Sequence, residues 1–188
     1  VPTTTGTGSE LVYNASIIDS KSKKKMGIND INNYPILAIL DPRLVSDAPL
    51  KVVISSTLDA LVHAIESFSS PKSNFVTKIF IKEAIKNIFL SFPNILKKKS
   101  KIDDWINLQW AAYFAMAGLS NTSSGPTGAL SYFLGANYSV PHGIAGGFFL
   151  KKILRFNQNK GYYGYAELYD SLPKIKLSKK RISNKSKS

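Results

Sequence analysis

An aspartate and a histidine stand four residues apart in the segment TLDALVHAIE, residues 57–66. At about 100° per residue, Asp59, His63 and Glu66 cluster on one side of a helix, opposite an apolar stripe. The stripe consists of Leu58, Leu61, Val62, Ile65 and Phe68. One carboxylate oxygen and one imidazole nitrogen at this spacing suit Fe²⁺ or Zn²⁺ better than Ca²⁺ or Mg²⁺, which prefer oxygen ligands. The alternative is a solvated polar face on an ordinary amphipathic helix.

Two further segments carry residue types that bind ligands. The chain opens with VPTTTGTGSE, in which glycines would let backbone N–H groups approach a phosphate or ribose and threonine hydroxyls would add hydrogen-bond donors. The alternative is an ordinary turn. Far downstream, His142 stands between Pro141 and Gly143, an arrangement typical of a helix start; a lone histidine is more often structural than a ligand.

The hydrophobic pattern, which predicts the elements that position these residues, changes along the chain. Short strands are expected at 11–19, 25–28 and 36–40, which together resemble the back half of an α/β domain. From Pro49 onward the pattern is helical. Helices are expected at 51–56, 57–68, 74–92, 103–119, 127–137 and 142–156, separated by proline and glycine breakers.

Composition narrows the function classes. The formal net charge is +13 over 188 residues, and seven basic residues with no acidic one fall in 174–188, where a disordered tail is expected. No aromatic residue is interleaved with those lysines, so specific nucleic-acid binding is not expected. The absence of cysteine fits a reducing cytoplasm, and no apolar run reaches the length of a membrane span.

Several motifs in a fixed order now indicate a family. They are PTTTGTGSE at 2–10, AILDPRL at 38–44, DALVHAIES at 59–67, VPHG at 140–143 and RFN at 155–157. In this order and spacing the chain resembles the iron-containing alcohol dehydrogenase family over roughly residues 1 to 170. The resemblance covers only part of the family's plan, because the glycine-rich phosphate loop expected upstream of PTTTGTGSE is absent; a fragment is therefore expected.

The resemblance implies a fold and an activity. The fold would be an α/β remnant of a Rossmann-like nucleotide domain at 1–47, an all-helical metal-binding domain of the dehydroquinate synthase-like type at 48–170, and a basic tail at 171–188. The activity would be NAD(P)-dependent, metal-assisted hydride transfer between a small alcohol and its aldehyde or ketone. A cytoplasmic protein is expected, and a homodimer is the assembly that the resemblance allows.

The resemblance also implies roles for particular residues. Asp59, His63 and His142 would bind Fe²⁺ or Zn²⁺, and Glu66 could orient His63 as a hydrogen-bond acceptor or be a surface carboxylate. Residues that would border NAD or NADP are Thr3, Thr4, Thr5, Thr7, Lys25 and Leu44. For Lys25 the alternative is a solvated charge in a lysine-rich loop.

The chain departs from the family at two positions. Gly128 stands where the resemblance implies a third ligand histidine, so a metal set of four ligands is reduced to three. Tyr132 stands where the family often keeps a histidine near the substrate. Three protein ligands can still bind such a metal, with lower affinity expected. Tyr132 would be a catalytic hydrogen-bond donor to substrate, although its phenol is a poor proton shuttle at neutral pH; the alternative is a packed aromatic.

Three hypotheses about function therefore stay open. The first is a metal-assisted alcohol dehydrogenase seen as a partial chain. The second is a relative with changed chemistry, acting on an anionic or polyhydroxylated substrate, to which Gly128 and Tyr132 would be adaptations. The third is a catalytically inactive, truncated helical module.

Overall fold

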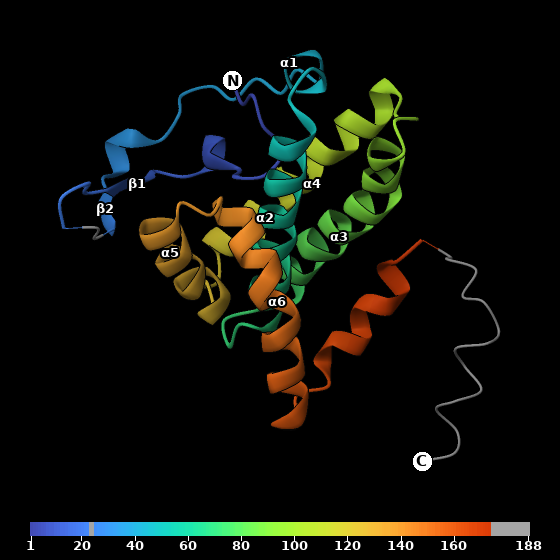
Figure 1. The fold of residues 1–188 in the computed structure, drawn as a ribbon. Coiled ribbons are helices and arrows are strands. Elements are labelled where there is room, and N and C mark those ends of the chain that lie inside the picture. The colour runs from blue at the N-terminus through green and yellow to red at the C-terminus, as the bar shows by residue number, and fades with distance from the viewer. Residues whose placement is uncertain (23–24, 174–188) are drawn as a thin grey trace.

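The computed structural model describes residues 1–22 and 25–173, and residues 174–188 of the tail expected at 171–188 lie outside them. Most of the described chain is helical (Figure 1). The α-helices are α1 Arg43–Ser46, α2 Leu50–Ser69, α3 Phe75–Leu96, α4 Ile102–Ser120, α5 Pro126–Tyr138 and α6 His142–Asn159. Three short 3₁₀ helices are η1 Ser9–Leu11, η2 Ile31–Asn33 and η3 Gly164–Ser171.

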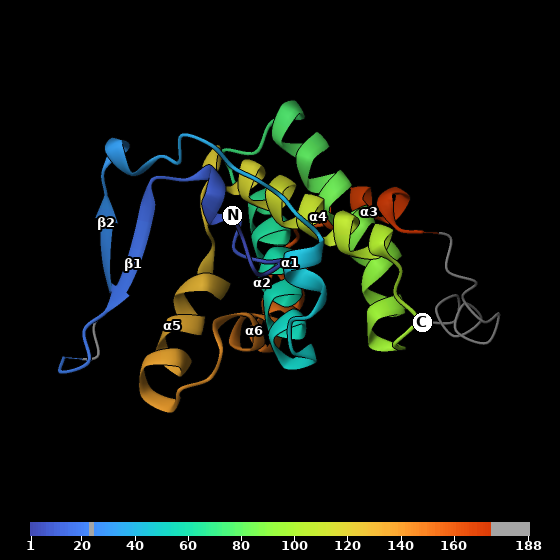
Figure 2. The same cartoon turned by 90° about the horizontal axis from the view of Figure 1, so that it is seen from above.

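The one sheet within the described residues is a two-stranded antiparallel hairpin. Strand β1, Asn14–Ile18, pairs with β2, Lys25–Asn29, so that Ile17 lies opposite Met26. Figures 1 and 2 both show this hairpin projecting to one side of the helices. Its apolar side chains are correspondingly exposed, with Ile18 at 49% and Met26 at 53%.

The expected strand at 36–40 is wrong: these described residues form no strand. A strand exists only where a neighbouring strand accepts its backbone hydrogen bonds, and no other described segment pairs with this one. The segment is nevertheless apolar and exposed, with Leu37 at 72% and Ile39 at 48%. The described residues therefore contain a hairpin in place of the expected α/β arrangement, and they include no parallel sheet.

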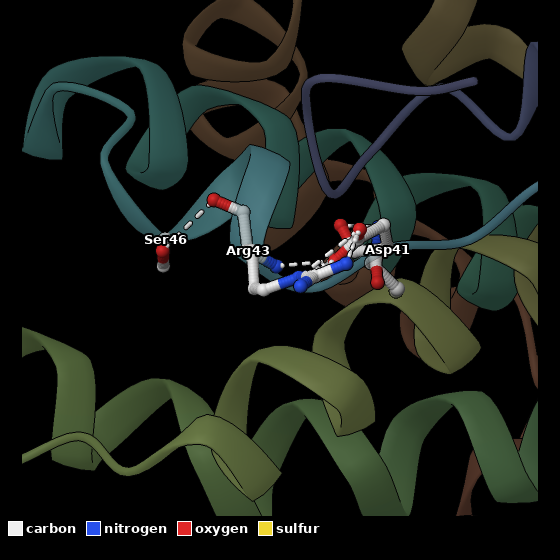
Figure 3. Close-up of polar contacts among 4 residues, drawn as sticks. Asp41, Arg43 and Ser46 are labelled. Atoms are coloured by element: carbon white, nitrogen blue, oxygen red, sulfur yellow. Dashed lines mark hydrogen bonds and ion pairs between the residues drawn. The ribbon is translucent and has the colours of Figure 1, made fainter.

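Helix α1 follows this segment and is held by a local carboxylate. Asp41 accepts a hydrogen bond from the Arg43 backbone N–H at 3.0 Å and forms an ion pair with the Arg43 guanidinium at 2.6 Å (Figure 3). This pairing lowers the pKa of Asp41 from its ordinary value, chiefly through the side-chain hydrogen bond from Arg43. The backbone carbonyl of Asp41 also accepts a hydrogen bond from Gln109 of α4 at 3.2 Å, which fastens the segment to the helical part.

Helix α2 is central, and the two helices expected at 51–56 and 57–68 are one continuous helix. It packs against α3, α4 and α6, which surround it in Figure 2. The core between α2, α3 and α4 contains Ala60, Ala64, Phe68, Ile81, Ile85, Leu108 and Ala115. The solvated polar face that was the alternative for α2 is not what the structure has, because the whole residues Asp59 and Glu66 are only 8% and 5% exposed. Helices α5 and α6 pack on that side of α2 and cover it.

Candidate metal and substrate site

Asp59 and His63 lie on consecutive turns of α2, as their spacing predicted. The distance between Asp59 Oδ1 and His63 Nε2 is 3.6 Å. Both side chains are largely withdrawn from solvent, with 11% of Asp59 and 16% of His63 exposed. The helix therefore presents an oxygen and a nitrogen donor together in a sheltered position.

His142 reaches the same aspartate from a different helix. It is the first residue of α6, and its Nε2 lies 3.7 Å from Asp59 Oδ1. Gly143 makes this approach feasible, because a β-carbon at that position would overlap the Ser55 carbonyl oxygen of α2. The glycine after the histidine thus lets the start of α6 sit directly on the α2 backbone.

The three side chains have donor types that suit a shared metal ion, and the two separations from Asp59 are close to those of two ligands on one ion. Two donors bonded to one tetrahedral ion at 2.0–2.2 Å are about 3.3 Å apart. Each imidazole nitrogen lies within a few tenths of an ångström of that separation from the Asp59 oxygen. Across residues 1–22 and 25–173, however, no three acidic or histidine side chains converge as a complete metal-binding group.

Burial fixes the protonation state of His63. Desolvation lowers its pKa from the ordinary 6.5 to about 4, against the opposing attraction of the Glu66 carboxylate. At neutral pH the imidazole is therefore uncharged, which is the form that coordinates metal ions. Its Nδ1 is buried and has no hydrogen-bond partner in the described part of the chain.

Tyr132 stacks on His142. The ring centroids are 4.6 Å apart and the planes differ by 23°. Tyr132 comes from α5, so this contact joins α5 to the start of α6 beside Asp59. A β-carbon at Gly128, one turn earlier on α5, would lie 3.6 Å from Glu66 Oε2, an ordinary van der Waals contact. Of the two positions where the resemblance implies histidines, 132 therefore lies against His142 and 128 lies beside Glu66.

Glu66 makes contacts that the sequence did not predict. Its Oε2 accepts the Gly125 N–H at 2.9 Å and its Oε1 accepts the Thr127 N–H at 2.6 Å, both at the start of α5. Glu66 is therefore not the hydrogen-bond acceptor that orients His63, because His63 Nδ1 has no partner, and it is not a surface carboxylate. In the sequence, Gly125-Pro126 indicated the start of a helix. A local pattern cannot show that a carboxylate from a distant helix accepts the hydrogen bonds of that helix start.

The opening threonine run divides into anchoring and exposed residues. Thr5 is 2% exposed, and its hydroxyl shares a hydrogen bond of 3.2 Å with that of Ser56 on α2. Thr3 and Thr7 are exposed, and Thr4 is half-buried. The run thus lies against α2 and keeps two hydroxyl side chains at the surface.

The other residues expected to border the cofactor are farther along the N-terminal region. Leu44 lies on α1 and is 50% exposed. The backbone of Lys25 begins β2, while its side chain lies outside what the structure describes. No described contact brings either residue to Asp59.

Comparison with known proteins decides the family. The model of the C-terminal region of the Fe-containing alcohol dehydrogenase family matches residues 53–186. The chain belongs to this family. The match confirms the resemblance drawn from the motifs, and the helical part of the fold corresponds to the C-terminal helical domain of these proteins.

Curated relatives extend over most of this chain. A 4-hydroxybutyrate dehydrogenase of Clostridium kluyveri is 34% identical over 170 residues, which are 87% of this chain and 45% of that protein. An NAD-dependent methanol dehydrogenase of Bacillus methanolicus is 32% identical over 157 residues, 84% of this chain and 41% of that protein.

A solved structure also has a similar fold. The iron-containing alcohol dehydrogenase of Thermococcus thioreducens matches with a TM-score of 0.80 at 30% identity, covering 91% of this chain and 44% of that one. In each case the chain spans less than half the length of the relative it matches.

Proposed function

We propose that this chain is the metal-binding and substrate-binding part of an NAD(P)-dependent alcohol dehydrogenase. The observation that carries the proposal is the position of Asp59 Oδ1, within 3.7 Å of both His63 Nε2 and His142 Nε2. The family match and the dehydrogenase relatives support it. Residues 1–47 would then belong to the nucleotide-binding part, residues 48–170 to the metal and substrate part, and 171–188 to a tail.

Each residue of the site would have a defined task. Asp59, His63 and His142 would hold Fe²⁺ or Zn²⁺; the neutral state of buried His63 at pH 7 leaves its nitrogen lone pair available. When bound, the metal supplies Lewis-acid polarisation of an alcohol or carbonyl oxygen and NAD(P) supplies or accepts the hydride. The Tyr132 hydroxyl would donate a hydrogen bond to the substrate oxygen.

The cofactor would be met by the N-terminal segment. Thr5 is already engaged with Ser56, so its part is to fix the run against α2. Exposed Thr3 and Thr7, with half-buried Thr4, would offer hydroxyl groups to the cofactor. Leu44 and Lys25 stay proposed cofactor neighbours.

The first experiment measures Fe and Zn in the anaerobically purified chain and in an Asp59→Ala/His63→Ala double variant. About one equivalent in the parent, lost in the variant, is expected. Metal absent from both, or equal in both, would overturn the metal site. A Glu83→Gln variant, changed on α3 away from the site, is the matched control and should retain the metal.

Turnover is then measured on the metal-loaded chain completed by an upstream nucleotide-binding half. NAD and NADP are supplied separately with methanol, 1-propanol and 4-hydroxybutyrate, and nicotinamide reduction is followed by absorbance. Reduction that depends on Asp59 supports the dehydrogenase. A preference for the carboxylated alcohol would favour the hypothesis of changed substrate chemistry, and failure to bind metal or cofactor even in the completed protein would favour the inactive module.

A further inference from the structure

Helix α5 carries Tyr132 into the site; it packs mainly against α6 and touches α2 at few places. Of its thirteen residues, Thr127 and Ser131 are buried. Its first residue, Pro126, has no N–H, and its N-cap residue, Gly125, offers no side-chain hydrogen bond to the helix start. The backbone N–H groups at a helix start need acceptors when they are withdrawn from water.

Glu66 supplies those acceptors from α2. Its two carboxylate oxygens take the N–H groups of Gly125 and Thr127 at 2.9 and 2.6 Å. A carboxylate at a helix N-terminus interacts favourably with the helix dipole, and burial strengthens a charge-assisted hydrogen bond. Glu66 is 5% exposed, so this contact is sheltered from water.

The fit between Glu66 and α5 is close. A β-carbon at Gly125 would lie 2.7 Å from Glu66 Oε1, nearer than real β-carbons come. A side chain at this position would push the carboxylate, the end of a flexible side chain, away from the backbone. The contact is therefore specified from both helices, by the acid on α2 and by the glycine before α5.

We propose that Glu66 is a positioning residue that holds α5 so that Tyr132 stays stacked on His142. Glu66 accepts hydrogen bonds at the start of α5, and Tyr132, on the second turn of that helix, stacks on His142 with ring centroids 4.6 Å apart. Glu66 thereby acts on the site through α5, without touching His63 by a hydrogen bond. Its consequence for substrate binding rests on the proposed dehydrogenase function; its consequence for the stacking does not.

The chain contains only two histidines, so the stacking can be observed directly. The imidazole C–H signals of His63 and His142 are recorded by NMR and assigned with a His142→Gln variant. A Tyr132→Leu variant gives the position of the His142 signal without the ring-current effect of the tyrosine. In Glu66→Gln, whose amide group would face one of the two N–H groups, the His142 signal should move toward that position. The Gly125 and Thr127 amides should exchange with solvent about ten- to a hundredfold faster.

Two further variants separate positioning from general destabilisation. Gly125→Ala pushes on the same carboxylate from α5 and should shift the His142 signal in the same direction. Asp104→Asn alters another buried carboxylate, which accepts hydrogen bonds from Lys101 and Asn94 at the start of α4. It should lower stability and leave the His142 signal in place.

The outcomes are distinct. An unmoved His142 signal in both Glu66→Gln and Gly125→Ala, or an equal movement in Asp104→Asn, would overturn the positioning role. If the signal moves as expected while the parent binds no Fe or Zn, the positioning role stands and the proposed dehydrogenase function fails. On a metal-loaded active chain, Glu66→Gln should raise KM or lower kcat with the metal content unchanged.

Discussion

The two halves of the site are built differently. On one side, the backbones of α2 and α6 meet directly, because Gly143 has no side chain to separate the α6 backbone from the Ser55 carbonyl. On the other side, α5 has two buried residues and is fastened at its start by Glu66. The first half sets the distances among Asp59, His63 and His142, and its geometry resists change because a backbone contact cannot yield. The second half is joined to α2 mainly through one carboxylate, so the position of α5 relative to α2 should be the easier one to alter.

The largest expected effect on stability comes from the backbone contact between α2 and α6. Gly143→Ala would place a methyl group against the Ser55 carbonyl oxygen and 3.0 Å from the Asp59 backbone nitrogen. The helices must separate, so the free energy of unfolding should fall by about 3 kcal/mol or more. Urea unfolding measures the change.

Gly135→Ala, in α5, is the matched control for that substitution. A β-carbon there would meet the Val140 carbonyl oxygen at 3.5 Å, an ordinary contact. Because alanine favours a helix interior over glycine, stability should rise by up to about 1 kcal/mol. Similar losses for Gly143→Ala and Gly135→Ala would refute the contrast between the two halves.

The second prediction concerns buried His63 and the pH dependence of the free energy of unfolding. The pKa of His63 is about 4 in the folded chain and 6.5 in the unfolded one. Between these values the unfolded state binds a proton that the folded state does not, so unfolding becomes easier as pH falls from about 6.5 to 4. The loss attributable to His63 in the metal-free chain should approach about 3 kcal/mol.

Unfolding measured at several pH values in parent and His63→Gln tests this. The variant has no proton to take up at this position, so its pH dependence should be shallower across that window. A slope as steep in His63→Gln as in the parent would assign the pH dependence to other groups.

The third prediction concerns position 128 on α5. Gly128→His would add an imidazole on α5 at a position where a β-carbon finds ordinary space beside Glu66. If the site binds metal, a fourth protein ligand should tighten Zn²⁺ binding by about tenfold or more. Gly135→His adds the same side chain two turns farther along α5 and should leave the affinity unchanged. Calorimetric titration with Zn²⁺ compares the three chains, and equal affinities would show that position 128 does not reach the metal.

The smallest effect should come from the N-terminal run. Thr5→Val keeps the side-chain shape but removes the hydroxyl that pairs with Ser56, which should cost about 1 kcal/mol. Thr3→Val, at an exposed position, should be nearly neutral. Thermal unfolding of the two variants tests whether this run is fastened to α2 through Thr5, and equal melting temperatures would contradict it.

The sequence by itself determined the features that depend on local spacing. An i, i+4 separation places Asp59 and His63 on one helical face wherever that helix packs. The proline and glycine breakers set most helix ends to within a few residues, but the expected end at residue 92 is wrong, because α3 continues through Pro93 to Leu96. The ordered motifs also identified the family. No helix within residues 1–22 and 25–173 combines the length and hydropathy needed to cross a membrane.

Only the tertiary structure decided what depends on contacts between distant segments. The apolar run at 36–40 has strand-like composition, but a strand needs a partner that the described residues do not provide. Whether the polar face of α2 is solvated or covered stayed open in the sequence, because periodicity does not show which helices will pack on it. Glu66 and the start of α5 are 59 residues apart for the Gly125 contact, so no local pattern could assign that carboxylate its partners. Burial and long-range hydrogen bonds arise from packing, and packing is set by the whole chain.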